Sequence, residues 1–221
     1  MIKRARAIAL TFAFALASPW NTAWAEDNNA HYYAGVQAGW HDLDRWSGDV
    51  HFGAGVSVPG HVTLDQNGQG GLIVGRERGP VRYEVEYQRG AFDLQSIHLG
   101  PQSQAAGGGG HYEALTLNAY RAAPIRGAVS AYLGAGIGYG RVEMPGARFN
   151  AGCNCFAPAS GKGLTWQLRV GLEYGADSPH KAFVQYTLLS LPGADSGGVP
   201  SVDYGRERIG IVGLGYRYAF K

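Results

Sequence analysis

Residues 212–220, close to the C-terminus, alternate between large apolar side chains and small or charged ones. Every second residue is aliphatic or aromatic: Val212, Leu214, Tyr216, Tyr218 and Phe220. Side chains project from one face of a β-strand with a period of two residues. The stretch therefore predicts a β-strand that has one continuous apolar face, and this face must be covered by something other than water.

The same alternation recurs in residues 81–88, where both faces can be read. One face is wholly apolar, and its residues are Val81, Tyr83, Val85 and Tyr87. The other face carries Arg82, Glu84, Glu86 and Gln88. A soluble sheet turns such a polar face to water, whereas a small membrane barrel turns it inward and places the apolar face against lipid. This segment alone does not distinguish the two arrangements.

The spacing of the alternating segments favours the membrane barrel. We expect eight strands, at residues 32–40, 70–78, 81–88, 112–122, 129–141, 166–174, 182–188 and 212–220. The links at 79–80, 123–128 and 176–180 are short, and those at 43–67, 91–110, 143–163 and 192–205 are long. Short and long links therefore alternate, as they do between the two ends of outer-membrane barrels. Within the first long link Phe52, Ala54, Val56 and Val58 alternate briefly, which suggests a hairpin that projects beyond the membrane. We predict an all-β fold, a transmembrane antiparallel up-and-down β-barrel with four long external loops.

The polar residues of these strands are then expected inside the barrel. The predicted lumen network consists of Arg82, Glu84, Glu86, Gln88, Gln167, Arg169 and Glu173. Eight strands leave little free bore, and enclosed charges need partners, so we expect these groups to plug the lumen. A narrow ion path lined by charged rings is the alternative. On this assignment Val85→Arg should cost about 2–4 kcal/mol, and Glu86→Gln much less.

The N-terminus has the features of a secretory signal peptide. A basic start is followed by a short apolar run over residues 7–17 and by Ala23-Trp24-Ala25, which is a small-x-small cleavage site. We predict a signal peptide at 1–25 and one barrel domain at 26–221. The first 25 residues carry three of the 19 basic residues and none of the 17 acidic ones. The remaining chain is nearly neutral, which argues against a nucleic-acid partner.

Four stretches together resemble a known protein family. They are YAGVQAG at 33–39, VRYEVEY at 81–87, AYLGAGIGY at 131–139 and GYRYAF at 215–220. Their order and spacing resemble the small eight-stranded outer-membrane proteins that include the OmpA membrane domain and the neisserial opacity proteins. The resemblance implies a bacterial outer-membrane location among lipid and lipopolysaccharide. It also implies that the barrel-assembly machinery reads the terminal strand, although Lys221 follows the usual final Phe. The family's roles range over anchoring, adhesion, serum resistance and weak pore activity.

Few residues suggest chemistry. Cys153 and Cys155 can form a disulfide in a loop of an exported protein, and two thiols alone make a poor metal site. Ser96 and His98 can share a strand face, with Asp93 or Glu113 as an acid, but their order is the reverse of the His-x-Ser of lipid A deacylase barrels. We therefore expect no catalytic, cofactor or metal site. The predicted role is envelope structure or surface interaction, with a narrow-pore porin and a lipid A-modifying enzyme as alternatives and the external ligand unknown.

Overall fold

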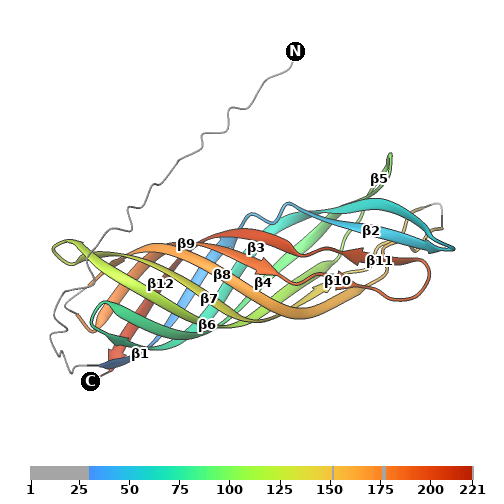
Figure 1. The fold of residues 1–221 in the computed structure, drawn as a ribbon. Coiled ribbons are helices and arrows are strands. Elements are labelled where there is room, and N and C mark those ends of the chain that lie inside the picture. The colour runs from blue at the N-terminus through green and yellow to red at the C-terminus, as the bar shows by residue number, and fades with distance from the viewer. Residues whose placement is uncertain (1–29, 151, 176–177, 221) are drawn as a thin grey trace, which may run out of the picture.

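The structure is a computed structural model that describes residues 30–150, 152–175 and 178–220. The predicted signal peptide at 1–25 lies outside these residues. The described chain consists of β-strands (Figure 1), and no helix in it is long and apolar enough to cross a membrane. The strands are β1 (His31–His41), β2 (Arg45–Gly53), β3 (Val56–Arg78), β4 (Val81–Leu99), β5 (Gln102–Ala105), β6 (Gly109–Arg126), β7 (Val129–Met144), β8 (Ala159–Tyr174), β9 (His180–Leu191), β10 (Ala194–Asp195), β11 (Ser201–Tyr204) and β12 (Glu207–Phe220).

Eight of these strands form a closed antiparallel ring. The ring runs β1–β3–β4–β6–β7–β8–β9–β12 and returns to β1. The first and last strands of the chain close it, from the pair Tyr32 and Phe220 to the pair His41 and Ile211. Closure gives every strand two hydrogen-bonded neighbours, so no strand edge is left open over this height. The predicted antiparallel barrel is confirmed.

The barrel continues beyond this ring at the end that carries the β2–β3 hairpin (Figure 1). There β2, β11 and β10 connect β3 to β8, through the pairings β3–β2, β2–β11, β11–β10 and β10–β8. The extension therefore closes with three short strands in place of β1, β12 and β9. We call this the hairpin end, and the opposite one, where Tyr32 meets Phe220, the terminal end.

The prediction of irregular links was wrong for much of the four long segments, although the hairpin suggested around residues 52–58 is present. Residues 43–67 form a hairpin that turns at Gly53, Ala54 and Gly55, all with positive φ. Residues 91–110 continue β4 as far as Leu99 and add β5. Residues 192–205 contain the short strands β10 and β11, and the segment 145–158 lies between β7 and β8. These strands were not recognised in the sequence because they are rich in glycine and polar residues. Each strand has too few apolar residues to give a long alternation.

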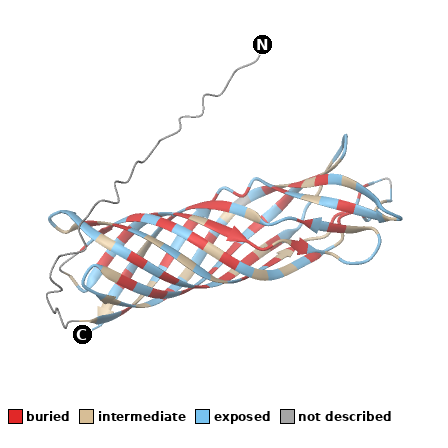
Figure 2. Cartoon of the chain, in the orientation of Figure 1, coloured by how far each residue is buried: buried red, intermediate tan, exposed pale blue. Residues whose placement is uncertain are grey.

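Buried and exposed residues alternate along the strands of the barrel (Figure 2). On the ring, the exposed residues are the apolar ones that the alternation identified. They include Val36, Leu72, Val74, Tyr83, Val85, Leu117, Ile137, Leu168, Val170, Val184 and Leu214, each at least 44% exposed. They form a continuous apolar belt around the ring, which is the pattern of a surface that faces lipid.

The extension has the opposite polarity. Its interior is a single apolar cluster that includes Trp46, Val50, Val62, Leu64, Phe92, Leu94, Ile97, Val142, Met144, Phe156, Val202 and Tyr204. The outward positions beside Phe92 and Leu94 on β4 are polar, Asp93 and Gln95, and both are exposed. The extension is thus packed like a water-soluble β-barrel, and it stands directly on a ring packed like a membrane barrel.

Candidate functional site in the barrel interior and at the hairpin end

Glycines on the inward face make room for the large side chains of the ring interior. Tyr120 lies over the position that a Cβ would take on Gly134, its neighbour on β7. Tyr132 occupies the same kind of space at Gly171 on β8. Alternating glycines and large residues therefore fill a narrow barrel without widening it.

The centre of the ring is an ion pair between Glu86 and Arg169. The Arg169 Nη1 and Nη2 donate to Oε2 and Oε1 of Glu86 at 2.7 and 2.8 Å. Glu86 also accepts hydrogen bonds from Gln37 at 2.6 Å and from Asn118 and Gln167 at 3.2 Å. The Glu86 and Arg169 side chains are 0% and 2% exposed. A two-armed pair with this many further donors is the arrangement that makes enclosed charges tolerable.

A second charge network lies toward the terminal end. Glu84 forms ion pairs with Arg82 at 2.9 Å and with Arg217 at 3.1 Å. Glu173 forms ion pairs with Arg82 at 3.2 Å, with Lys181 at 3.6 Å, and with Arg217. Lys181 in addition bonds both carboxylate oxygens of Glu77, at 2.9 and 3.0 Å.

Positive and negative charges balance within the interior. The two networks contain four cations, Arg82, Arg169, Lys181 and Arg217, and four carboxylates, Glu77, Glu84, Glu86 and Glu173. The two networks therefore have no net charge that would select cations over anions or the reverse.

Toward the hairpin end the interior becomes amidic and then apolar. Gln88 donates to Gln167 at 3.2 Å, and the Tyr112 hydroxyl donates to Gln69 at 2.8 Å. Directly above, Phe92 and Trp46 are 0% exposed and belong to the apolar cluster of the extension. Along the barrel axis the interior thus changes from paired charges at the terminal end, through amides, to an apolar core.

The structure places all seven residues of the predicted lumen network in the interior, and each is at most 5% exposed. The sequence analysis missed other members of the same network: Gln37, Glu77, Asn118, Lys181, Gln185 and Arg217. Their signal was the same two-residue period. Arg217, for example, lies between Tyr216 and Tyr218, so its side chain had to point inward once those tyrosines pointed outward.

The terminal strand presents its predicted apolar face outward. Val212, Leu214, Tyr216, Tyr218 and Phe220 are between 40% and 55% exposed. The same strand pairs with β9 on one side and with β1 on the other. Recognition of this strand by the barrel-assembly machinery stays a prediction.

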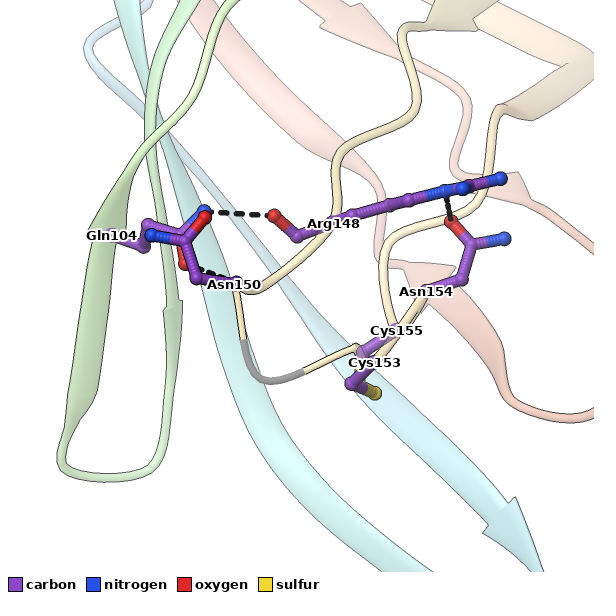
Figure 3. Close-up of a disulfide and its surroundings, with 6 residues drawn as sticks. All are labelled: Gln104, Arg148, Asn150, Cys153, Asn154 and Cys155. Atoms are coloured by element: carbon purple, nitrogen blue, oxygen red, sulfur yellow. Dashed lines mark hydrogen bonds between the residues drawn. A yellow bond between two sulfur atoms is a disulfide. The ribbon is translucent and has the colours of Figure 1, made fainter.

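At the hairpin end, residues 145–158 are tied down at several points (Figure 3). Cys153 and Cys155 form a disulfide, and Arg148 Nε donates to Asn154 at 3.2 Å. Gln104 on β5 donates to the Arg148 carbonyl at 2.8 Å and accepts from the Asn150 backbone at 2.6 Å. A groove of about 490 Å³ lies beside these contacts, between residues 106–107 and 146–148. Arg148 and Asn150 are therefore held beside β5.

Ser96 and His98 lie on β4 and not in a loop, because β4 extends to Leu99. His98 Nε2 lies 2.9 Å from Ser96 Oγ and 3.3 Å from Thr63 Oγ1, and its ring stacks on His61 with centroids 4.2 Å apart.

The two candidate acids have other partners. Asp93 accepts a hydrogen bond from Asn67 at 2.7 Å, and Glu113 pairs with Arg89 at 3.1 Å. In the described part of the chain neither carboxylate hydrogen-bonds to His98, so the structure does not bring together the three groups that a serine hydrolase needs.

Comparison with known proteins identifies the fold. No family model matches the sequence, and a search of curated proteins found no match. The structure is similar to that of the neisserial surface protein NspA, with a TM-score of 0.54 and 16% identity over 87% of this chain and 99% of that one. It is similar to the outer-membrane protein OprG from Pseudomonas aeruginosa, with a TM-score of 0.54 and 16% identity over 86% and 95% of the two chains.

Proposed function

Because the chain has the fold of the small outer-membrane β-barrels, we propose that it is an integral protein of the bacterial outer membrane. In this proposal its lumen is closed to ions, and its hairpin end is a surface for interaction outside the cell. The observation that carries the proposal is the reversal of polarity along the barrel, from an apolar outside and charged inside to a polar outside and apolar inside.

The height of the apolar belt supports membrane insertion. On β8 the belt runs from Leu164 to Tyr174, both more than half exposed. Ten residue steps cover about 33 Å along a strand, which is about 25 Å along the axis at a tilt of ~40°. This height matches the apolar band of outer-membrane barrels. Closure of the ring satisfies the backbone groups that would otherwise be unpaired in hydrocarbon.

The links between strands support the orientation. At the terminal end the strands are joined by the short links 79–80, 127–128 and 175–179. Outer-membrane barrels have short turns on the periplasmic side and long segments outside. We therefore place the terminal end in the periplasm and the extension beyond the outer leaflet.

Burial supports a closed lumen. A water-filled path would leave inward side chains in contact with solvent, whereas Glu86, Gln88, Thr165 and Phe92 are 0% exposed. Planar-bilayer recordings test this point, with a general porin in the same bilayer as the positive control. We expect no large, stable channels from the purified protein. Large, stable channels would contradict the closed lumen.

The location is tested by membrane fractionation and by gel migration with and without heating. The barrel should appear in the outer-membrane fraction and should migrate differently when boiled. Protein that is freely soluble without detergent would contradict the outer-membrane location, because the exposed apolar belt would then need another explanation.

The surface role is tested at the tips of the hairpin end. Deletion of residues 145–158 is unsuitable, because Phe149, Cys155 and Phe156 belong to the apolar cluster. Exchange of the exposed residues 54–55, 100–101 and 197–199 for Gly-Ser segments replaces no member of that cluster. Loss of adhesion by whole cells supports surface interaction, and unchanged adhesion with unchanged barrel folding supports a purely structural role.

The enzyme alternative rests on Ser96 and His98, which are hydrogen-bonded. We infer no catalysis there, since the candidate acids pair elsewhere. Mass spectrometry of lipid A from cells with and without the protein tests this inference. A modified lipid A that disappears in Ser96→Ala would contradict it.

A further inference from the structure

Three exposed basic residues lie together on the outside of the barrel, where the apolar belt gives way to the extension. They are Lys162 on β8, Arg206 before β12, and Arg208 on β12. We call them the outer basic cluster. We propose that this cluster binds the phosphorylated headgroup of an outer-leaflet lipid. The inference rests on the proposed outer-membrane location and adds to it a specific lipid site.

Register and contacts bring the three residues to one place. The Arg206 Nη1 donates to the Leu164 carbonyl at 2.7 Å and to Ser190 Oγ at 3.3 Å. The Arg208 guanidinium lies 5.8 Å from the centre of the Trp166 ring. Lys162 is two residues beyond Leu164 on the same face of β8. The cluster therefore surrounds the last apolar side chains of the belt.

A break in the strand ladder fixes the position of Arg206. The pairing of β8 with β9 ends at Trp166 and Ser190, and β8 next pairs with β10 at Ser160 and Asp195. Arg206 donates to a main-chain carbonyl inside this break. An arginine has five N–H donors, so a guanidinium held through Nη1 still has donors for a second, anionic partner.

The three cations of this cluster differ from the paired cations on β4 and β7. On β7, which neighbours β8, Arg141 pairs with Glu143, and further around the barrel Arg89 on β4 pairs with Glu113 on β6 at 3.1 Å. Across residues 30–150, 152–175 and 178–220, no ion pair to a carboxylate is formed by Lys162, Arg206 or Arg208. Three unneutralised cations at one level of the surface favour an anionic ligand.

The level of the cluster selects the kind of anion. Leu164 is 54% exposed and lies on the apolar belt, and Trp166 lies one step further along the same face. Tryptophan and exposed leucine at this position mark the edge of the hydrocarbon, where lipid headgroups begin. The guanidinium of an arginine binds phosphate through two parallel hydrogen bonds. A lipid whose acyl chains contact Leu164 therefore presents its phosphate to the cluster.

The test measures lipid binding by the purified full-length mature chain in detergent with native mass spectrometry. The probes are lipid A with both phosphates and the same lipid A after enzymatic removal of the phosphates. The test variant is Lys162→Gln with Arg208→Gln, which leaves the hydrogen bonds of Arg206 in place. The matched control is Arg121→Gln with Arg126→Gln, which removes two exposed cations from the terminal end.

We expect the test variant to bind phosphorylated lipid A about 10- to 30-fold more weakly, at the usual contribution of two basic residues near an anionic surface. The control variant should bind it as the unchanged protein does. All three proteins should bind the dephosphorylated lipid equally and weakly. Heat-dependent gel migration verifies folding, and Lys162→Arg, which keeps the charge, should retain binding.

Equal binding of the two lipids by the unchanged protein would overturn the inference, as would full binding by the test variant or an equal loss in the control variant. Because the assay uses purified protein, its result is separate from that of membrane fractionation. Outer-membrane protein without phosphate-dependent binding would contradict only the lipid site, whereas protein outside the membrane fraction would contradict the proposed function.

Discussion

Gln88 and Phe92 point into the barrel from the same strand, four residues apart, and the polarity of the interior changes between them. Gln88 donates to Gln167 within the polar ring, whereas Phe92 belongs to the apolar cluster of the extension. The outer face of β4 changes at the same height, from the exposed Tyr87 to the exposed Arg89. One strand therefore crosses from a membrane barrel into a water-soluble one without any interruption of its alternation.

Substitutions on the outer face of β4 should depend on their height. Val85→Arg places a charge in the middle of the apolar belt, and we expect it to lower the free energy of unfolding by about 2–4 kcal/mol. Ala91→Arg is the matched control, since Ala91 is exposed on the same face of β4 but above the belt, and it should change the unfolding free energy little. Denaturant unfolding in lipid vesicles measures both. Equal losses would contradict the assigned position of the membrane.

Glu86→Gln should be strongly destabilising, in contrast to the small effect expected from sequence. The substitution leaves the Arg169 guanidinium enclosed without its counter-charge, and breaking a buried pair costs about 3–5 kcal/mol. The double variant Glu86→Leu with Arg169→Met should lose less than the sum of the two single variants, because no lone charge remains. Unfolding in vesicles supplies the four values of this double-mutant cycle, and strict additivity would contradict the pairing.

The membrane ring could be predicted from the sequence because one rule governs all of it. Lipid outside and a narrow space inside impose the same alternation on every strand, so Val85 and Glu86 reveal their faces by their positions alone. The partners inside could not be predicted in the same way. That Arg217 meets Glu84 depends on how far each strand is shifted around the ring, and no segment of the sequence contains that information.

Apart from its hairpin around residues 52–58, the extension was missed because its strands obey the reverse rule. A search for apolar outward faces reads Asp93 and Gln95 as loop residues, although they alternate with the buried Phe92 and Leu94. Residues 107–110 are all glycine, which strengthened that interpretation. The lesson is physical: one strand that passes through two solvents needs two opposite patterns, and each must be read on its own side of the boundary.

The apolar core of the extension should stabilise the hairpin end and should contribute little to the stability of the eight-stranded membrane ring. Phe92→Ala removes a fully buried phenyl group from that core and should destabilise the extension by about 3–5 kcal/mol. Phe52→Ala is the control, because Phe52 is 37% exposed near the turn of the β2–β3 hairpin. Protease added to intact cells should cleave the Phe92→Ala protein faster, while the membrane ring stays protected. Equal cleavage rates in the two variants would contradict a packed extension.

The stacked histidines should make the extension sensitive to acid. Burial lowers the pKa of His61 below its ordinary value of 6.5, and the charges of Arg45 and of His98 lower it further. The unfolded chain then takes up this proton at a higher pH than the folded chain does. The contribution of neutral His61 to the stability of the extension is therefore complete above pH 6.5, and it is lost as the pH falls from 6.5 toward the lowered pKa.

Histidine NMR in micelles should show the ring of His61 titrating below pH 6.5, and His98→Gln should move its midpoint upward, because one of the groups that oppose protonation is removed. Protease resistance of the hairpin end should fall between pH 7 and pH 5 in the unchanged protein and fall less in His61→Gln, which has no proton to gain. A midpoint for His61 above 6.5, or one that does not respond to His98→Gln, would show that the stacked rings do not share the electrostatic environment that their 4.2 Å separation implies.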